Sequence, residues 1–207
     1  MRIEVVVFDG FDEMDAVGPY EVLRNAANVV AGRDGEPWEV ALVGAYGAGV
    51  VHASHGLRLL VDSGLGEHGQ PDAIVVPGGG WGDRAPTGAW HEAQEGDLPH
   101  DLAELAPGCR WVASVCTGAM LLATAGLTRG RPATTHEVAL ADLRASGAMV
   151  REGVRYVDDG DLLTSAGVTA GLDLACWLVE RELGPDVAAA VTREMAYERS
   201  ARTTPNG

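Results

Sequence analysis

Residues Arg110–Leu127, RWVASVCTGAMLLATAGL, contain the pattern around which the rest of this sequence is organised. A β-favouring apolar run ends at Cys116, and small, apolar residues then follow at helical spacing as far as Gly126, where a C-terminal cap is expected. The pattern predicts a strand, a sharp turn that holds the cysteine, and a helix. Such a turn exposes its side chain at the carboxyl end of a sheet, as a nucleophile elbow does.

The expected position of Cys116 at a helix N-terminus has a chemical consequence. Free N–H groups and the positive end of the helix dipole favour a thiolate, so we expect a pKa below the ordinary value of about 8.5. The alternative is a buried structural cysteine, the commonest role of a lone cysteine in a cytosolic protein. The local pattern leaves both interpretations open.

Composition excludes several classes of protein. The 207 residues include 30 acidic and 15 basic side chains, a net charge of −15 that disfavours nucleic acid and anionic membranes as partners. Three cysteines without metal-type spacing predict reduced thiols and no metal site. With no signal segment and no apolar run of membrane-spanning length, we expect a cytoplasmic protein with one domain over residues 1–207 and a core in about 3–195.

Strands and helices are predicted to alternate along the chain, which is typical of an α/β fold with a mostly parallel sheet. The predicted strands are Ile3–Phe8, Trp38–Val43, Ala73–Val76, a hairpin in Val50–Val61, and a pair at Val154–Val157 and Leu162–Ser165. The predicted helices are one with Pro19 in its first turn, then Asp101–Leu105, a helix opened by Thr134, Thr135 and His136, Leu172–Leu183, and one that starts at Pro185. Residues 83–100 are expected to form a surface excursion.

Three other segments fall where the loops after the strands converge. Asp15 lies among apolar neighbours, so its carboxyl either points inward, where it needs a partner or a raised pKa, or simply favours the start of a helix. The glycines Gly78–Gly80 follow a strand and suit either an oxyanion hole of backbone N–H groups or a plain turn. His136 is either helix-start packing or a site residue.

Five segments together resemble the ThiJ/PfpI superfamily of class I glutamine amidotransferase-like proteins, and within it most of all the isonitrile hydratases. They are Met14–Val22, Val76–Gly79, Ser114–Ala119, Ala133–His136 and Thr164–Gly171. The resemblance implies a flavodoxin-like three-layer sandwich and a homodimer with its sites near the interface. It also implies Cys116 as the nucleophile, Asp15 as its acidic partner, and an oxyanion-type pocket from the N–H groups of Gly79 and Thr117. Gly78 and His136 are expected beside that pocket.

The sequence departs from the superfamily's pattern in two places. Peptidase-like members carry histidine directly after the nucleophile, whereas position 117 is threonine, which disfavours protease activity. The proline-rich segment expected after the last helix is replaced by Met195–Arg199. Relatives that regulate transcription append a helix-turn-helix domain, and the residues after Gly184 are too few to form one, so regulation of DNA is not expected.

The hypothesis that follows is a cofactor-independent, cysteine-dependent hydro-lyase. Cys116 is expected to attack the terminal carbon of an isonitrile, with Asp15 protonated at neutral pH and supplying a proton, to give a thioimidate that water converts to an N-substituted formamide. Two alternatives stay open. One is a glyoxalase- or deglycase-like enzyme that acts on small aldehydes, and the other is a non-catalytic cysteine redox sensor.

Overall fold

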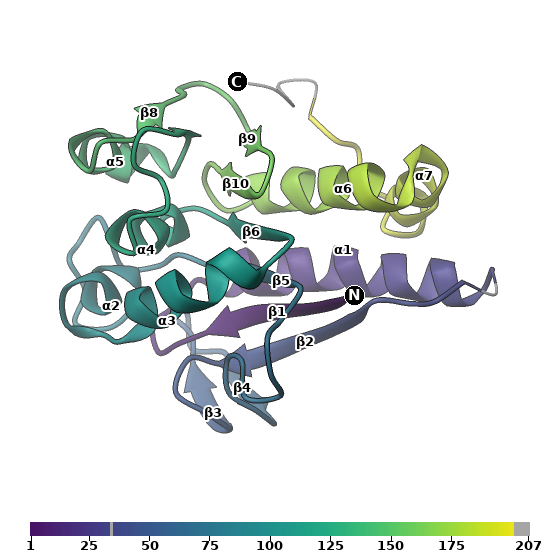
Figure 1. Cartoon of the computed structure of the whole chain (residues 1–207), viewed down its shortest axis with the longest axis horizontal. Coiled ribbons are helices and arrows are strands. Elements are labelled where there is room, and N and C mark those ends of the chain that lie inside the picture. Colours follow the sequence, from purple (N-terminus) through teal and green to yellow (C-terminus); the bar gives the residue numbers. More distant parts are fainter. Residues whose placement is uncertain (34, 201–207) are drawn as a thin grey trace.

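The computed structural model of the protein describes residues 1–33 and 35–200 and shows a six-stranded sheet between layers of helices (Figure 1). The strand order is β2-β1-β5-β6-β10-β9, and every neighbouring pair is parallel except β9 and β10. These strands are β1 (Arg2–Val7), β2 (Glu39–Gly44), β5 (Ala73–Val76), β6 (Trp111–Ser114), β9 (Tyr156–Asp159) and β10 (Leu162–Ser165). The predicted α/β class with a mostly parallel sheet is therefore confirmed.

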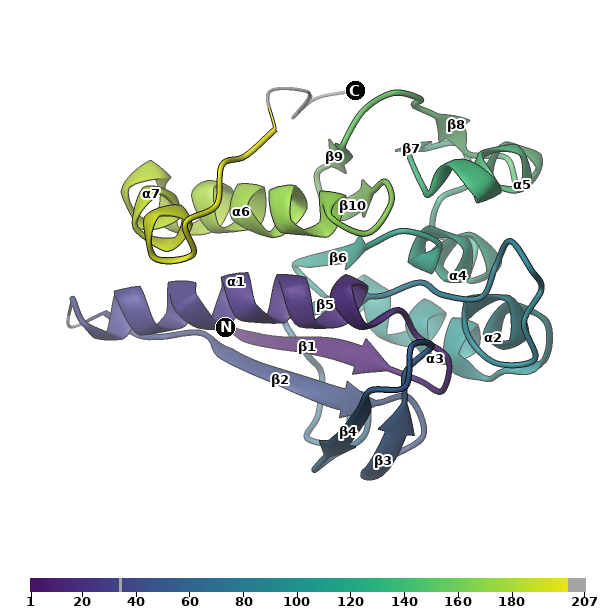
Figure 2. The ribbon, with the colours of Figure 1, turned by 180° about the vertical axis from the view of Figure 1, so that it is seen from behind.

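Helices cover both faces of this sheet. On one face α1 (Glu13–Ala31), α6 (Ala170–Leu183) and α7 (Pro185–Glu194) pack against one another, nearest the viewer in Figure 2. On the other face α2 (Ala89–Glu95), α3 (Leu98–Leu105) and α4 (Gly118–Thr124) form a second group (Figure 1). Because both faces are covered, the inner strands are apolar throughout, and β5 and β6 are buried at every position.

Two small sheets lie outside the main one. The first is the predicted hairpin, with β3 (Gly49–His52) antiparallel to β4 (Arg58–Val61), and it projects below β2 in Figure 1. The second pairs β7 (Pro132–Ala133) with β8 (Met149–Val150), beside α5 (Leu140–Ala145). The hairpin is fastened to the loop after β1, because Gly10 N donates to His52 O over 2.7 Å.

Helix α1 begins earlier than the sequence predicts. Asp12 caps it, accepting a hydrogen bond from Met14 N at 3.1 Å, so Pro19 lies inside the helix and not in its first turn. Proline has no N–H, and the backbone carbonyl of Asp15 therefore lacks its usual hydrogen bond from the residue four positions on. The earlier start places Asp15 in the first turn of α1, at the end of the sheet where β1 finishes.

Two other predictions were wrong in detail. The expected surface excursion over residues 83–100 contains α2, which buries Glu92 and packs against α4. The helix predicted after Thr134 begins with a 3₁₀ turn, Glu137–Ala139, and only continues as α5 at Leu140; His136 caps that turn, its Nδ1 accepting from Val138 N. Within the described residues no helix is long and apolar enough to cross a membrane. The polar stretch Arg202–Gly207 of the sequence lies outside the described residues.

Candidate active site

The cysteine turn has the geometry of a nucleophile elbow. Cys116 follows β6, precedes α4 and has a φ of +56°, a left-handed conformation that costs a side-chain-bearing residue free energy. Hydrogen bonds on both sides hold it there: Cys116 N donates to Ala166 O at 3.1 Å, and Thr135 Oγ1 donates to Cys116 O at 2.8 Å. The surrounding chain thus imposes the strained turn, and the thiol is 93% buried.

The loop after β5 presses directly on this elbow. A Cβ atom on Gly78 would lie 2.4 Å from Thr117 Oγ1, and one on Gly118 would lie 2.2 Å from Val76 O. Real Cβ atoms do not approach other atoms so closely, so both positions need glycine. The contact brings the N–H groups of Gly78 and Gly79 to the start of α4.

Asp15 is the buried acid of the site, as the sequence predicted, with a side chain that is fully inaccessible to solvent. Gly78 N donates to its Oδ2 at 3.1 Å, while Oδ1 is buried without a hydrogen bond in the described chain. Its burial, together with the charge of Asp12, raises the pKa of Asp15 from 3.8 to about 7. Protonated and ionised forms of Asp15 therefore coexist at neutral pH.

The thiol of Cys116 titrates in the direction opposite to the expected one. Burial and the charge of Asp15 raise the pKa of Cys116 to about 12, although the backbone N–H groups of Val168 and Thr117 lower it. The helix start thus acts as predicted, but desolvation and a facing carboxylate outweigh it. Cys116 and Asp15 behave as a coupled pair in which the first proton leaves from the carboxyl.

The N–H groups of the glycine loop are already engaged. Gly79 N donates to Thr117 Oγ1 at 2.9 Å, so the glycine predicted for an oxyanion hole positions the threonine hydroxyl in this structure. The N–H groups that act on the sulfur are those of Thr117 and Val168, and Val168 has a strained φ of +34°. Neither Val168 nor Thr135 was predicted as a residue of the active site, although both lie in segments that carry the family resemblance.

His136 packs against the loop that reaches the cysteine elbow. Its ring packs on Gly167, where a Cβ would be 2.5 Å from His136 Cδ2, and it lines a cavity of about 330 Å³ with Thr134 and Thr135. Within the described chain its hydrogen bond to Val138 N is local, and none joins it to Cys116. His136 therefore lines a cavity that Ala166 and Gly167, next to the cysteine elbow, also line.

One group of side chains in the described part of the chain, Asp12, Glu13 and His55, is close enough to hold a metal ion, with ligand atoms within 4.8 Å of one another. Glu13 is already occupied: its carboxylate contacts His55 Nδ1 at 2.7 Å and accepts from His55 N at 2.8 Å. Although burial raises it, hydrogen bonds from His55 and Leu57 lower the pKa of Glu13 to about 2. We interpret the group as the clamp that holds the hairpin against α1.

The remaining cysteines lie outside the site. Cys176, on α6, is 99% buried in the core, and Cys109 is half-buried after α3. All three cysteines are free thiols. Cys109 therefore offers a matched control for substitutions at Cys116.

Fold and site together define an α/β protein with a cysteine elbow beside a buried acid. The chain belongs to the DJ-1/PfpI family, whose sequence pattern matches residues 1–181. It is 32% identical over 200 residues to an isonitrile hydratase from Pseudomonas putida, a match that covers 95% of this chain and 78% of the hydratase. It is also 28% identical over 185 residues to a deglycase from Pyrococcus abyssi, covering 87% and 96% of the two chains.

Two further similarities concern domain content and fold. The transcriptional regulator GbdR from Pseudomonas aeruginosa is 30% identical over 199 residues, and this chain spans only 51% of that regulator's length. A crystal structure of a ThiJ/PfpI family protein from Pseudomonas syringae superposes with a TM-score of 0.82 at 24% identity, covering 96% of this chain and 76% of that one. The structural likeness establishes the flavodoxin-like sandwich predicted from the sequence.

Proposed function

We propose that this protein is an isonitrile hydratase, which adds water to an isonitrile and releases an N-substituted formamide. The observation that carries the proposal is the pairing of Cys116, held in a left-handed elbow, with Asp15, a fully buried carboxyl whose pKa is about 7. A nucleophile and a proton carrier that exchange one proton near neutral pH suit this reaction. The similarity to the hydratase from Pseudomonas putida supports the choice of substrate class.

The first half of the reaction uses both groups. Ionised Asp15 takes the proton of the Cys116 thiol as the sulfur forms a bond to the terminal carbon of the isonitrile. Asp15 then gives that proton to the same carbon, which leaves a thioimidate, R–N=CH–S–Cys. One proton moves from sulfur to carbon through the carboxyl, so the balance needs no other donor.

Water completes the second half. Its oxygen adds to the thioimidate carbon, while Asp15 takes a proton from the water and passes it to the nitrogen. The C–S bond then breaks, the formamide leaves, and the remaining hydroxyl proton returns to the sulfur. The N–H groups of Thr117 and Val168 stabilise negative charge on the departing sulfur, which is the role their effect on the thiol pKa supports.

Turnover of cyclohexyl isonitrile, with formamide measured by chromatography, tests the proposal. We expect the wild-type protein and the variant Cys109→Ser to form formamide at equal rates, and Cys116→Ser to form none above background. Methylglyoxal is the parallel substrate, because a relative from Pyrococcus abyssi is a deglycase. Consumption of methylglyoxal without formamide from any isonitrile would replace the proposal with an aldehyde enzyme. Stoichiometric oxidation of Cys116 without turnover of either substrate would replace it with a redox sensor.

We also propose that the protein forms a homodimer through the β3–β4 hairpin. The hairpin presents Leu60 and Val50, which are 74% and 54% exposed, and Leu57 at its turn is 41% exposed. Adjacent apolar side chains of this size favour burial against another surface. Analytical ultracentrifugation is expected to give a dimer that Leu60→Asp dissociates, while Met149→Asp, at an exposed apolar position on β8, leaves it intact.

A further inference from the structure

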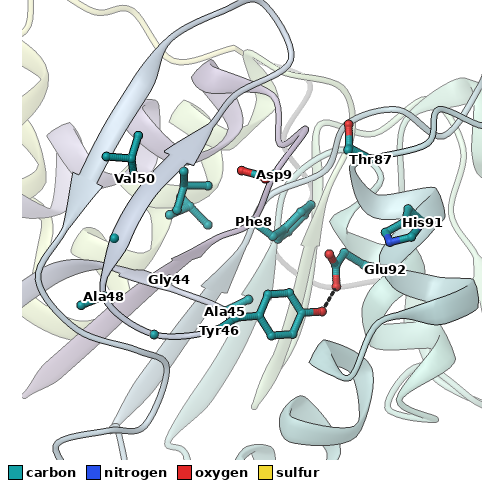
Figure 3. A pocket seen from close by; sticks show the side chains of 14 residues that line it. Phe8, Asp9, Gly44, Ala45, Tyr46, Ala48, Val50, Thr87, His91 and Glu92 are labelled. Carbon is teal, nitrogen blue, oxygen red and sulfur yellow. Dashed lines mark hydrogen bonds between the residues drawn. The ribbon is translucent and has the colours of Figure 1, made fainter.

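A second cavity, of about 360 Å³, opens beside the edge of the sheet (Figure 3). The ends of β1 and β2, the turn into β3, and α2 surround it. The turn Gly44–Gly49 is made of glycine, alanine and one tyrosine, and these small residues leave the space unfilled. The reaction proposed for Cys116 does not use this cavity.

The floor of the cavity carries a buried carboxyl. Glu92 is 96% buried, and its Oε2 accepts a hydrogen bond from the Tyr46 hydroxyl. That is the only hydrogen bond of the Glu92 side chain to the described residues, and its other oxygen points into the cavity toward Phe8 (Figure 3). This second oxygen is reached from the cavity, so it can accept a hydrogen bond from a ligand there, and a carboxylate favours a charged donor.

The other polar groups of the wall are mainly acceptors. The Asp9 carboxylate stands at the mouth of the cavity with 60% of its side chain exposed, and Thr87 adds a hydroxyl. Neither arginine nor lysine lines the cavity, and His91 is its one basic side chain. In a chain with a net charge of −15, this wall attracts cations and repels anions.

The spacing of the acids selects a molecular cation over a metal ion. Among residues 1–33 and 35–200, the group close enough to share an ion is Asp12, Glu13 and His55, so Asp9, His91 and Glu92 lie too far apart for one. An ammonium group has three donors that reach separate acceptors. The accessible Tyr46 ring and the side chain of Ala45 offer an apolar surface to a short carbon chain beside that group.

We propose that this cavity binds a small primary ammonium compound, with its –NH₃⁺ group on Glu92 and its carbon chain against the Tyr46 ring. The site is distinct from the Cys116 pair and lies next to it. Thr87 lines both the Glu92 cavity and another cavity of about 360 Å³, which Gly79 and Asp12 also line. Gly88 N donates to Asp9 O, and Ala89 N to Gly79 O, both at 2.8 Å, so one stretch of backbone separates the two regions.

Isothermal titration of the full chain with n-butylammonium chloride tests the site, with n-butanol and sodium butyrate as neutral and anionic matches. We expect saturable binding of butylammonium alone. Glu92→Gln keeps an oxygen for the Tyr46 hydroxyl but loses the charge, and it is expected to weaken binding at least about tenfold, the effect of one lost charge-assisted hydrogen bond. Glu104→Gln removes the same charge from an exposed position on α3 and is expected to bind as the wild type does.

A second readout needs no variant. In the wild-type protein, butylammonium is expected to shift the backbone amide resonances of Gly44–Val51, His91 and Glu92 more than any others. Equal binding of butanol, unchanged binding by a folded Glu92→Gln protein, or amide shifts centred elsewhere would each overturn the proposal. Absence of saturable butylammonium binding would do the same.

Discussion

Two buried carboxyls with raised pKa values lie at the same end of the sheet, and their surroundings differ. Asp15, in the first turn of α1, contacts the N–H of Gly78 and faces the Cys116 thiol. Glu92, in the first turn of α2, faces the Tyr46 hydroxyl and an open cavity. Burial is the largest cause of the raised pKa in both cases.

The difference lies in the group that shares the proton. The sulfur of Cys116 is a nucleophile once it loses its proton, so a proton exchanged with Asp15 does chemical work. Burial and the neighbouring Glu92 raise the pKa of Tyr46 above its ordinary value of 10, so the phenol keeps its proton. The thiol beside Asp15 therefore suits that carboxyl to catalysis. The phenol and the open cavity beside Glu92 suit that carboxyl to binding a ligand.

The largest expected effect is on turnover in Asp15→Asn. The active pair holds a single proton, so wild-type kcat/KM is expected to rise as the pH passes about 7, where Asp15 ionises, and then to level off. The variant is expected to lose about 10²- to 10⁴-fold in kcat together with this rise. Steady-state kinetics from pH 5 to 9 measure both. Glu104→Gln is the control of equal charge change, and a variant profile that matched the wild type would remove Asp15 from the mechanism.

Asp15 is also expected to make stability depend on pH. Its pKa is raised from 3.8 to about 7, so its favourable contribution is complete below pH 4 and is lost as the pH rises through 7. The loss amounts to about 4 kcal/mol. Urea unfolding of the wild type and Asp15→Asn at pH 4.5 and 8.5 should show the variant gaining about 3 kcal/mol in relative stability, because part of the loss has already occurred at pH 4.5. A difference that stays constant with pH would contradict the raised pKa.

Thr135→Val tests the support of the elbow. The substitution leaves the backbone carbonyl of Cys116 without its donor in a site where Thr135 is 98% buried. We expect unfolding free energy to fall by about 1–2 kcal/mol and kcat to fall about tenfold, since the strained turn loses one of its two restraints. Thr192→Val on α7, where the hydroxyl also donates to a backbone carbonyl, should change kcat by less than twofold. Equal kinetic effects of the two variants would place the strain elsewhere.

The smallest effect is expected at the second carboxyl, Glu92. Tyr46→Phe removes the donor to Glu92 and keeps the aromatic ring, so unfolding free energy should fall by about 1 kcal/mol, measured by urea titration at pH 7. Tyr20→Phe on α1 is the matched control. A loss as large as that caused by ionising Asp15 would mean that the Tyr46–Glu92 contact is a main support of the fold and not the wall of a ligand cavity.

The sequence alone predicted the strands of the main sheet, most of the helices and the cysteine turn, and it offered an inward Asp15 as one of two interpretations. These features follow from local patterns, since apolar runs, glycines and the spacing of small residues act over a few neighbours along the chain. Helix α2 was missed because its short sequence, AWHEAQE, lies in a polar, glycine-rich stretch, and its burial of Glu92 depends on packing against the rest of the molecule.

Only the tertiary structure decided the chemistry of the site. The sequence places Cys116 at a helix start and so predicts a low thiol pKa, but burial and the facing Asp15 charge reverse that direction. The N–H of Gly79, predicted to bind an oxyanion, donates instead to Thr117 Oγ1. The N–H of Val168, which lies in a loop distant in the sequence, faces the sulfur. Desolvation and long-range charge depend on which segments meet in space, and no local pattern contains that information.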